Sequence, residues 1–289
     1  MPKRYNMKNY SLGLYEKAMP DGLTFPEMLR MTRAAGFDRL EISIDETDAR
    51  LGRLNWSGAE MSALVRAIGD EGVPIRTMCL SGHRKYPLGS HETVVRSRAL
   101  EIMERAVDFS SRIGVAVIQM AGYDVYYESG DQDTELWFAE NLQMCVEIAG
   151  KNGILLGFET METPFMDTVE KAMRYVSRVN SPYLGVYPDV GNLMNAAVLY
   201  GGELGADLSR GAGHIYAAHL KETKPGIYRN MCFGEGHTDY ARAISVLWDM
   251  GVRMFTGEMW YLGEAEPLSL LQRANAFLRD KIERTCKGD

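Results

Sequence analysis

The chain has 289 residues, and its 39 acidic side chains outnumber its 32 lysine and arginine side chains, which gives a formal net charge of −7. Hydrophobic residues make up 46% of the chain and charged residues 25%, a composition typical of soluble globular proteins. The negative charge argues against a protein that binds nucleic acid, and no uncharged apolar stretch is long enough to span a membrane. We therefore expect neither nucleic acid nor a membrane as a partner.

The four cysteines are far apart in the sequence. Cys79, Cys145, Cys232 and Cys286 form no Cys-x-x-Cys pair, and such wide spacing in a long chain is not typical of a disulfide framework. We therefore expect reduced thiols and a cytoplasmic protein.

Short apolar runs alternate along the chain with longer amphipathic segments. The runs are too short for helices, and several are rich in β-branched and aromatic residues, which favours strands. The segments between them place apolar residues at helical spacing, and one of them begins with Ser57 and Glu60 in the spacing of a capping box. The predicted strands are Ser11–Met19, Phe37–Asp45, Pro74–Gly82, Val115–Gly122, Ile154–Thr160, Leu184–Asn192, Ile215–Glu222 and Arg253–Trp260. The predicted helices are Ser57–Glu71, His91–Ile113, Asp133–Asn152, Thr168–Asn180 and Asp239–Met250.

Eight such runs in one chain leave about 36 residues for each, which is the size of a strand with its crossover helix. Alternation of this kind predicts parallel strands covered by helices. A doubly wound sheet usually has a glycine-rich turn after its first strand, whereas this chain has Pro20, Asp21 and Gly22 there. No linker or low-complexity tract divides the sequence. We therefore predict an α/β protein with a (β/α)8 TIM barrel in a single domain over residues 1–289.

Four residues with metal-binding side chains lie at or near the ends of consecutive predicted strands. They are Glu159, Asp189, His219 and Glu258. In a barrel, the carboxyl ends of the strands build the active site, and a buried charge is costly unless something compensates it. Each residue taken alone is more often a strand-end residue paired with a lysine or arginine. Taken together, three carboxylates and one imidazole predict a site for one divalent ion, and the donors suit Mn²⁺, Co²⁺, Zn²⁺ or Mg²⁺.

Cationic and polar residues follow two of the predicted strands. Ser81, His83 and Arg84 lie in the loop after the third strand, and Lys221 and Lys224 follow the ligand on the seventh. Such a group can hold a phosphate or sugar hydroxyls, although solvated charges and surface ion pairs are an equally common explanation. The absence of a G-x-x-x-x-G-K-[ST] loop argues against nucleoside triphosphate chemistry.

Several long motifs give the chain a recognisable family resemblance. From about Leu12 to beyond Trp260 it resembles the L-ribulose-5-phosphate 3-epimerases, also called L-xylulose-5-phosphate 3-epimerases, of the xylose-isomerase-like barrel superfamily. The resemblance implies a metal-dependent epimerase of L-ketopentose 5-phosphates in ascorbate or related pentose degradation. It also places the family's metal ligands on the four strand-end residues named above. The motifs are MCLSGHRKYPLGS, VIQMAGYDVYYE, YPDVGNL, AAHLKETKPG, FGEG and GEMW.

The predicted reaction interconverts L-ribulose 5-phosphate and L-xylulose 5-phosphate by removing and returning the C3 proton through a cis-enediolate stabilised by the metal. Two groups are needed, one on each side of the sugar, and we assign Glu159 and Glu258 as the catalytic acid/base pair. The other two ligands serve only to hold the metal. Glu162 and Asn192 are placed to hydrogen-bond sugar hydroxyls.

A barrel of this kind could have one of three other functions, and the sequence argues against the second and the third. An epimerase or aldose–ketose isomerase of a free ketose or of another sugar phosphate would use the same metal site. A nuclease of the apurinic-site type would need a basic surface and more than the five histidines present. A non-catalytic sugar-binding barrel would have lost at least one ligand, and none is missing. We further expect a homodimer, since barrel enzymes often associate through their helices.

Overall fold

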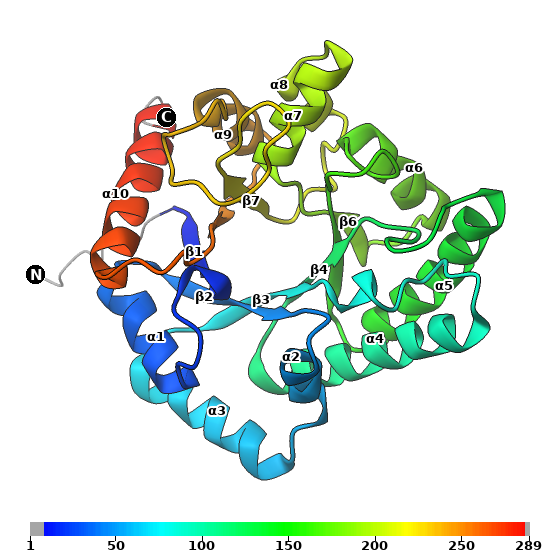
Figure 1. The fold of residues 1–289 in the computed structure, drawn as a ribbon, viewed down its shortest axis with the longest axis horizontal. Helices are drawn as coiled ribbons and strands as arrows, with labels where there is room; N and C mark the ends of the chain where they lie inside the picture. The colour runs from blue at the N-terminus through cyan, green and yellow to red at the C-terminus, as the bar shows by residue number, and fades with distance from the viewer. Residues whose placement is uncertain (1–8, 287–289) are drawn as a thin grey trace, which may run out of the picture.

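Parallel strands form the centre of the structure. The computed structural model describes residues 9–286 apart from the side chain of Cys286, and within this range it contains an eight-stranded parallel sheet in the order β6-β5-β4-β3-β2-β1-β8-β7. Figure 1 shows these strands in the middle, with helices around them. The strands are β1 (Ser11–Tyr15), β2 (Arg39–Ile44), β3 (Ile75–Leu80), β4 (Val117–Ala121), β5 (Leu155–Glu159), β6 (Leu184–Val186), β7 (Ala218–Lys221) and β8 (Met254–Glu258).

The two ends of this sheet meet between β6 and β7. Val186 forms a parallel bridge with Ile215, and its backbone is held by hydrogen bonds from Val186 N to His214 O (2.8 Å) and from Tyr216 N to Val186 O (3.1 Å). Because β1 also pairs with β8, the sheet closes on itself. The prediction of a (β/α)8 barrel is confirmed.

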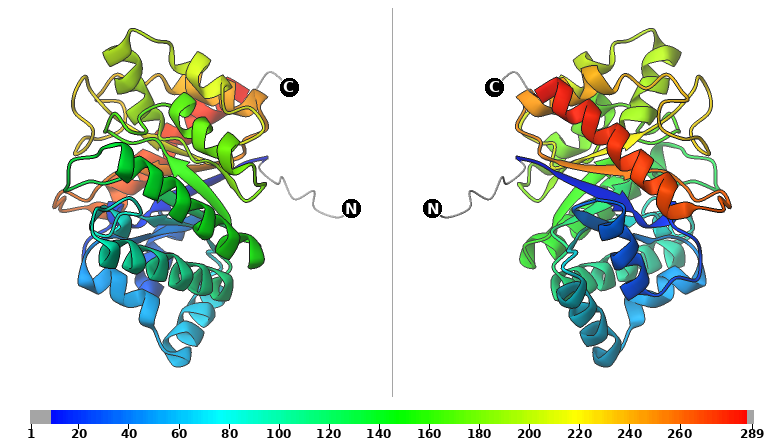
Figure 2. Two further views of the ribbon diagram at one scale, coloured as in Figure 1. Left: turned by 90° about the vertical axis from the view of Figure 1, so that its right-hand side faces the viewer. Right: turned by 90° about the vertical axis from the view of Figure 1, so that its left-hand side faces the viewer.

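Helices cover the outside of the barrel. The five predicted helices are all present with ends within two residues of those expected, and the capping box at Ser57 forms, with Ser57 N and Oγ both bonded to Glu60 Oε2 at 2.8 Å. Figure 2 shows from two opposite sides that the helices lie outside the strands. The longer helices are α1 (Phe25–Ala34), α3 (Gly58–Glu71), α4 (Thr93–Ile113), α5 (Gln132–Lys151), α6 (Val169–Val179), α7 (Val190–Tyr200), α9 (Tyr240–Asp249) and α10 (Pro267–Cys286). Shorter pieces are α2 (Asp48–Gly52), α8 (Leu204–Ser209), and the 3-10 turns η1 (Glu16–Ala18), η2 (Arg53–Asn55) and η3 (Gly82–Arg84).

Two predicted strands were too long. The run Leu184–Asn192 contains only the short strand β6, and α7 begins at Val190. The reason is a helix cap: the side chain of Asp189 accepts a hydrogen bond from Asn192 N at 2.9 Å, which satisfies a free amide of the first turn. The run Ser11–Met19 likewise ends as a strand at Tyr15 and continues as η1.

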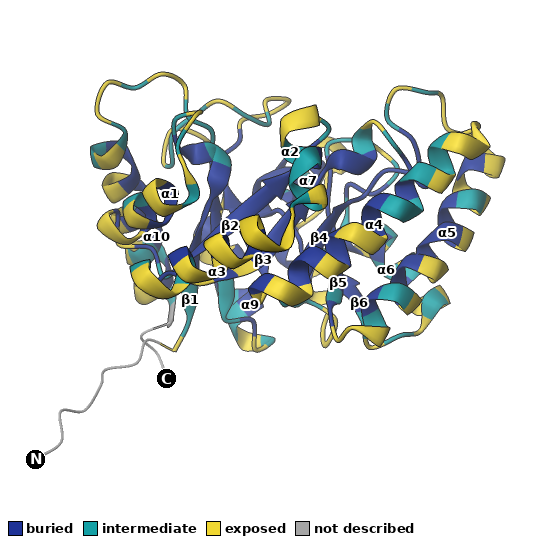
Figure 3. Ribbon diagram, turned by 90° about the horizontal axis from the view of Figure 1, so that it is seen from below, coloured by how far each residue is buried: buried dark blue, intermediate teal, exposed yellow. Residues whose placement is uncertain are grey.

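The apolar core lies between the strands and the helices. Figure 3 shows buried residues along the strands and exposed residues on the outer faces of the helices, as expected for amphipathic helices on a barrel. Cys79 and Cys145 are buried free thiols and Cys232 is a free, half-buried one, whereas the side chain of Cys286 lies outside the described residues. Among residues 9–286, no helix is both long and apolar enough to cross a bilayer.

Gly185 is needed where the barrel closes. A Cβ atom at this position would overlap the carbonyl oxygen of His214 and lie 2.7 Å from the ring of Tyr216. We expect Gly185→Ala to lower the free energy of unfolding by about 1–3 kcal/mol, because the seam cannot accept the added methyl group without moving backbone. The matched control is Gly69→Ala in α3, where nothing lies within 4 Å of the added atom and alanine should stabilise the helix by about 0.5–1 kcal/mol. Urea unfolding of both variants tests this, and equal effects would contradict it.

Candidate metal centre

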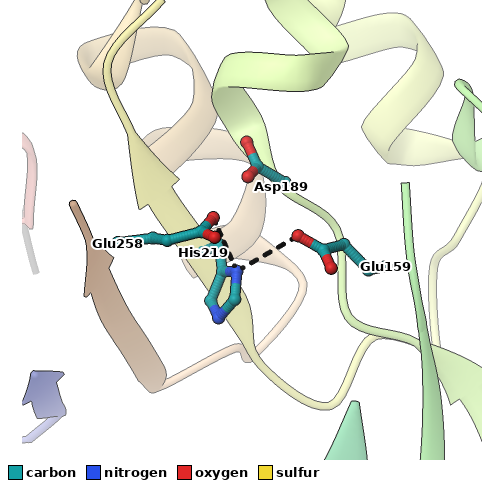
Figure 4. A group of neighbouring side chains, drawn as sticks. All are labelled: Glu159, Asp189, His219 and Glu258. Carbon is teal, nitrogen blue, oxygen red and sulfur yellow. Dashed lines mark ion pairs between the residues drawn. The ribbon is translucent and has the colours of Figure 1, made fainter. Parts of the chain in front are cut away.

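The four predicted ligands come together at the carboxyl ends of β5 to β8. Glu159 and Glu258 are the last residues of β5 and β8, His219 lies within β7, and Asp189 forms a backbone bridge with His219. All four are buried, and their ligand atoms lie within 4.8 Å of one another. Figure 4 shows the side chains pointing toward one point from four successive elements. The arrangement therefore places four metal-type donors around one small volume.

The ring of His219 has a defined orientation. Its Nδ1 atom faces the carboxylates, at 3.0 Å from Glu258 Oε2 and 3.5 Å from Glu159 Oε1. Its Nε2 atom points the other way and lies 2.5 Å from Oε1 of Glu41. The side-chain amide of Gln119 lies beside the ring, with its Nε2 atom 3.0 Å from Nδ1 and 3.4 Å from Nε2 of His219. Of the two ring nitrogens, Nδ1 is the one that faces the carboxylates and so the one placed to bind a metal.

The buried carboxylates strongly perturb one another. Burial and the nearby charge of Glu258 raise the pKa of Glu159, and burial together with Glu258 raises the pKa of Asp189 to about 8 even though Lys221 opposes this shift. Burial would also raise the pKa of Glu258, but the charges of Lys221 and His219 hold it well below its usual range. Lys221 Nζ lies 2.6 Å from Asp189 Oδ2 and 3.7 Å from Glu258 Oε2.

The donor set fits a divalent metal ion. Asp189 Oδ2 and Glu258 Oε2 are buried without a hydrogen bond of normal geometry among the described residues, and their close contacts are the charged groups of Lys221 and His219. A cation held between the three carboxylates would relieve their mutual repulsion and occupy these oxygens. Three carboxylate donors and one imidazole nitrogen suit Mn²⁺, Co²⁺, Zn²⁺ or Mg²⁺ better than a thiolate-preferring metal.

A cleft opens above these residues at the mouth of the barrel. Five of the predicted substrate-binding residues line it: Ser81, Arg84, Glu162, Asn192 and Lys221. Glu159 and Glu258 line it too, so both proposed acid/base groups face the same space as these polar side chains. The other lining residues are Tyr15, Lys17, Cys79, Met161, Tyr228, Arg229 and Trp260.

Two predicted substrate contacts, His83 and Lys224, are not among the residues that line the cleft. His83 is buried, and its Nε2 lies 3.1 Å from the carbonyl oxygen of Ala99 in α4, because η3 turns the ring toward the helix layer. Lys224 is exposed in a tight turn in which its backbone N and O bond to Ile227 at 3.0 and 2.8 Å. Their contact with the substrate therefore stays a prediction from the sequence alone.

Two cationic residues of the cleft were not predicted from the sequence. Lys17 pairs with Asp45 Oδ2 at 2.6 Å, and Arg229 pairs with Glu162 Oε1 at 3.1 Å while its guanidinium lies 5.6 Å from the ring centre of Trp260. Lys17 fell within a run assigned to a strand, and Arg229 lies in an irregular loop without a motif. Both follow the carboxyl end of a strand, and that position is the signal from which they could have been found.

The fold and the site together define a TIM-barrel protein with a candidate divalent metal centre at the carboxyl end of its strands. The family model described as "Xylose isomerase-like TIM barrel" matches residues 29–281, and the chain belongs to this family.

Curated relatives match almost the whole chain. It is 40% identical over 278 residues to L-ribulose-5-phosphate 3-epimerase UlaE of Salmonella paratyphi A, covering 96% of each chain, and equally to the protein of the same name from Escherichia coli strain SE11. This bears out the family resemblance seen in the sequence motifs.

Solved structures with low sequence identity share the fold. A structure of L-ribulose 3-epimerase aligns with a TM-score of 0.78 at 18% identity, covering 96% of each chain. A D-psicose 3-epimerase in the presence of D-fructose aligns with a TM-score of 0.78 at 15% identity, covering 94% of this chain and 99% of that one.

The buried ring of His83 makes the fold sensitive to acid. Burial lowers the pKa of His83 from 6.5 to about 4, so between these values the unfolded chain binds a proton that the native protein does not. The free energy of unfolding therefore decreases as the pH falls from 6.5 to 4, and at pH 4 this one group has lowered it by about 3 kcal/mol. We expect His83→Gln to flatten this part of the pH dependence of unfolding in urea. An unchanged dependence would contradict the burial of a neutral imidazole at this position.

Proposed function

We propose that the protein is a metal-dependent 3-epimerase that interconverts L-ribulose 5-phosphate and L-xylulose 5-phosphate. The observation that carries this proposal is the pair Glu159 and Glu258, which come from β5 and β8, belong to one buried cluster and line one cleft. The curated relatives at 40% identity, named L-ribulose-5-phosphate 3-epimerases, support the choice of substrate.

One divalent ion, Mn²⁺, Co²⁺, Zn²⁺ or Mg²⁺, would be held by Glu159, Asp189, His219 Nδ1 and Glu258. It would supply Lewis-acid polarisation of the C2 carbonyl and stabilise the negative charge of the enediolate.

Glu159 and Glu258 transfer the proton in this proposal. Inversion at C3 requires that a proton leave one face of the sugar and return to the other, so a base and an acid must stand on opposite sides. The two carboxylates project from different strands toward the same space. One takes the C3 proton and the other delivers a proton to the opposite face, and the roles exchange in the reverse direction.

The remaining polar groups would bind the rest of the sugar. Asn192 lines the cleft, and its Nδ2 donates to the carbonyl oxygen of Thr160 at 2.8 Å, while its buried Oδ1 has no partner among the described residues. That oxygen is free to accept a hydrogen bond from a sugar hydroxyl. Ser81 follows β3 and Glu162 follows β5, and both line the cleft and would contact further hydroxyls.

The charge of the cleft matches a phosphorylated substrate. Its lining cations and the carboxylates of the lining and the metal centre are equal in number, so their formal charges cancel. A divalent ion would leave two positive charges, which complements a phosphate monoester of about −1.5 to −2 at neutral pH. The cations are Lys17, Arg84, Lys221 and Arg229, and the carboxylates are Glu159, Glu162, Asp189 and Glu258.

Replacing either acid/base carboxylate should stop the reaction. We expect Glu159→Gln and Glu258→Gln each to lower kcat by about 10²–10⁴-fold, because an amide cannot carry the proton. At least one variant should also stop incorporation of solvent deuterium at C3, measured by NMR of the recovered sugar. Glu203→Gln is the control, since Glu203 pairs with Arg242 at the start of the outer helix α8. Wild-type epimerisation and exchange in both active-site variants would refute the two-carboxylate mechanism.

The phosphate should dominate substrate selection. With metal added, we expect kcat/KM for L-ribulose 5-phosphate to exceed that for L-ribulose by about 100-fold, because charge-assisted hydrogen bonds hold the phosphate. A chelator should abolish both activities. Comparable values for the two sugars would favour the alternative, an epimerase or aldose–ketose isomerase of free ketoses on the same site.

A further inference from the structure

A buried carboxylate lies beneath the metal centre inside the barrel. Glu41, on β2, is fully buried. Its Oε2 accepts hydrogen bonds from Thr77 Oγ1 (2.6 Å), Tyr187 Oη (2.7 Å) and Thr256 Oγ1 (3.2 Å). Its Oε1 lies 2.5 Å from Nε2 of His219. The two oxygens therefore face different partners, hydroxyl groups on one side and the imidazole on the other.

The threonine hydroxyls that bind Glu41 also bind a buried arginine, Arg39. Arg39 donates from Nη1 to Thr77 Oγ1 at 2.7 Å and from Nη2 to Thr256 Oγ1 at 2.8 Å. Gly13 leaves room for this guanidinium, because a Cβ there would lie 2.6 Å from Arg39 Nη1. Two threonine hydroxyls thus accept from Arg39 and donate to Glu41, which compensates the buried negative charge and fixes the carboxylate in place.

This geometry determines which ring nitrogen of His219 reaches the cluster. An imidazole that binds a metal is neutral, with one N–H donor and one acceptor nitrogen, and a carboxylate only accepts. Contact with Glu41 Oε1 therefore requires the proton on Nε2 and leaves the lone pair of Nδ1 directed at Glu159 and Glu258. Carboxylates that hold a ligating histidine in this way fix its tautomer and ring orientation.

We propose that Glu41 is a positioning residue for the metal centre, which presents Nδ1 of His219 to the ion from a carboxylate anchored by Thr77 and Tyr187. This inference rests on the metal-dependent function proposed above. It assigns to Glu41 a role in metal binding that is separate from the proton transfer of the two catalytic carboxylates.

Metal affinity tests the inference independently of catalysis. We expect Glu41→Gln to bind Co²⁺ about 10–100-fold more weakly than the wild type, measured by competition with a chelator, and to change the visible absorption spectrum of the Co²⁺ protein. Glu41→Asp should also bind weakly, because it keeps the charge but shortens the reach to Nε2. Tyr187→Phe keeps Glu41 and removes one anchoring hydroxyl, so a smaller loss of Co²⁺ affinity is expected.

The control is a buried carboxylate that does not touch the metal centre. Asp167 is 5% exposed and pairs with Lys171 Nζ at 2.7 Å and Tyr200 Oη at 2.5 Å. Asp167→Asn should lower stability without changing Co²⁺ affinity or the Co²⁺ spectrum.

The outcomes separate this inference from the proposed function. If Glu41→Gln and Tyr187→Phe bind Co²⁺ with wild-type affinity and spectrum, Glu41 only balances Arg39 and the inference is wrong. If Glu41→Gln does not fold, Tyr187→Phe decides the question in the same way. If the wild type itself binds no Co²⁺, both proposals fail, whereas a wild type that binds Co²⁺ but does not epimerise overturns only the proposed function.

Discussion

The structure depends on holding three carboxylates together in a buried volume at the end of a barrel. Like charges at this separation repel strongly where water is excluded, and the protein opposes that repulsion with its own cations. Lys221 lies 2.6 Å from Asp189, and His219 lies between Glu159 and Glu258. The four side chains arrive on consecutive strands because a closed barrel brings the carboxyl ends of those strands to one rim.

Asp189 shows how the fold and the site use the same side chain. Its Oδ1 accepts the hydrogen bond that caps α7, and its Oδ2 faces Lys221 within the cluster. The backbone of Asp189 is also fixed, because its N–H donates a hydrogen bond to Thr160 Oγ1 at 3.0 Å. The cap therefore stabilises the helix and orients the second oxygen toward the site. The short strand β6 and the early start of α7 together place Asp189 at the position where it can do both.

The sequence predicted the barrel and the metal-type ligands because both depend on local patterns. Each ligand ends or follows an apolar run, and the alternation of runs and helices required parallel strands. Helices α1, α7 and α10 were not predicted. The start of α7 was assigned to a strand because the apolar residues of β6 continue without a break to the residue that caps the helix. His83 and Lys224 were chosen by residue type, but side-chain direction in a loop depends on neighbours that the sequence does not reveal.

Glu41 illustrates the largest gap between sequence and site. Its partners are distant in the chain: Tyr187 is 146 residues away and His219 is 178 residues away. In the sequence it is an acidic residue in the middle of a predicted strand, and no neighbouring residue indicates what compensates its charge. Only closure of the barrel brings β2, β6, β7 and β8 around one interior axis. It thereby forms the chain of hydrogen bonds that joins Arg39, Thr77, Glu41 and His219.

Lys221 gives the centre a fixed positive charge that belongs to the chain. Its ammonium group is buried within reach of Asp189 and Glu258, so part of the repulsion between the carboxylates is offset before any ion binds. A chain of this size also buries enough apolar surface to fold without a metal. We therefore expect the barrel to form without the ion, with the ligands held in place by the hydrogen bonds and ion pairs of the fold itself.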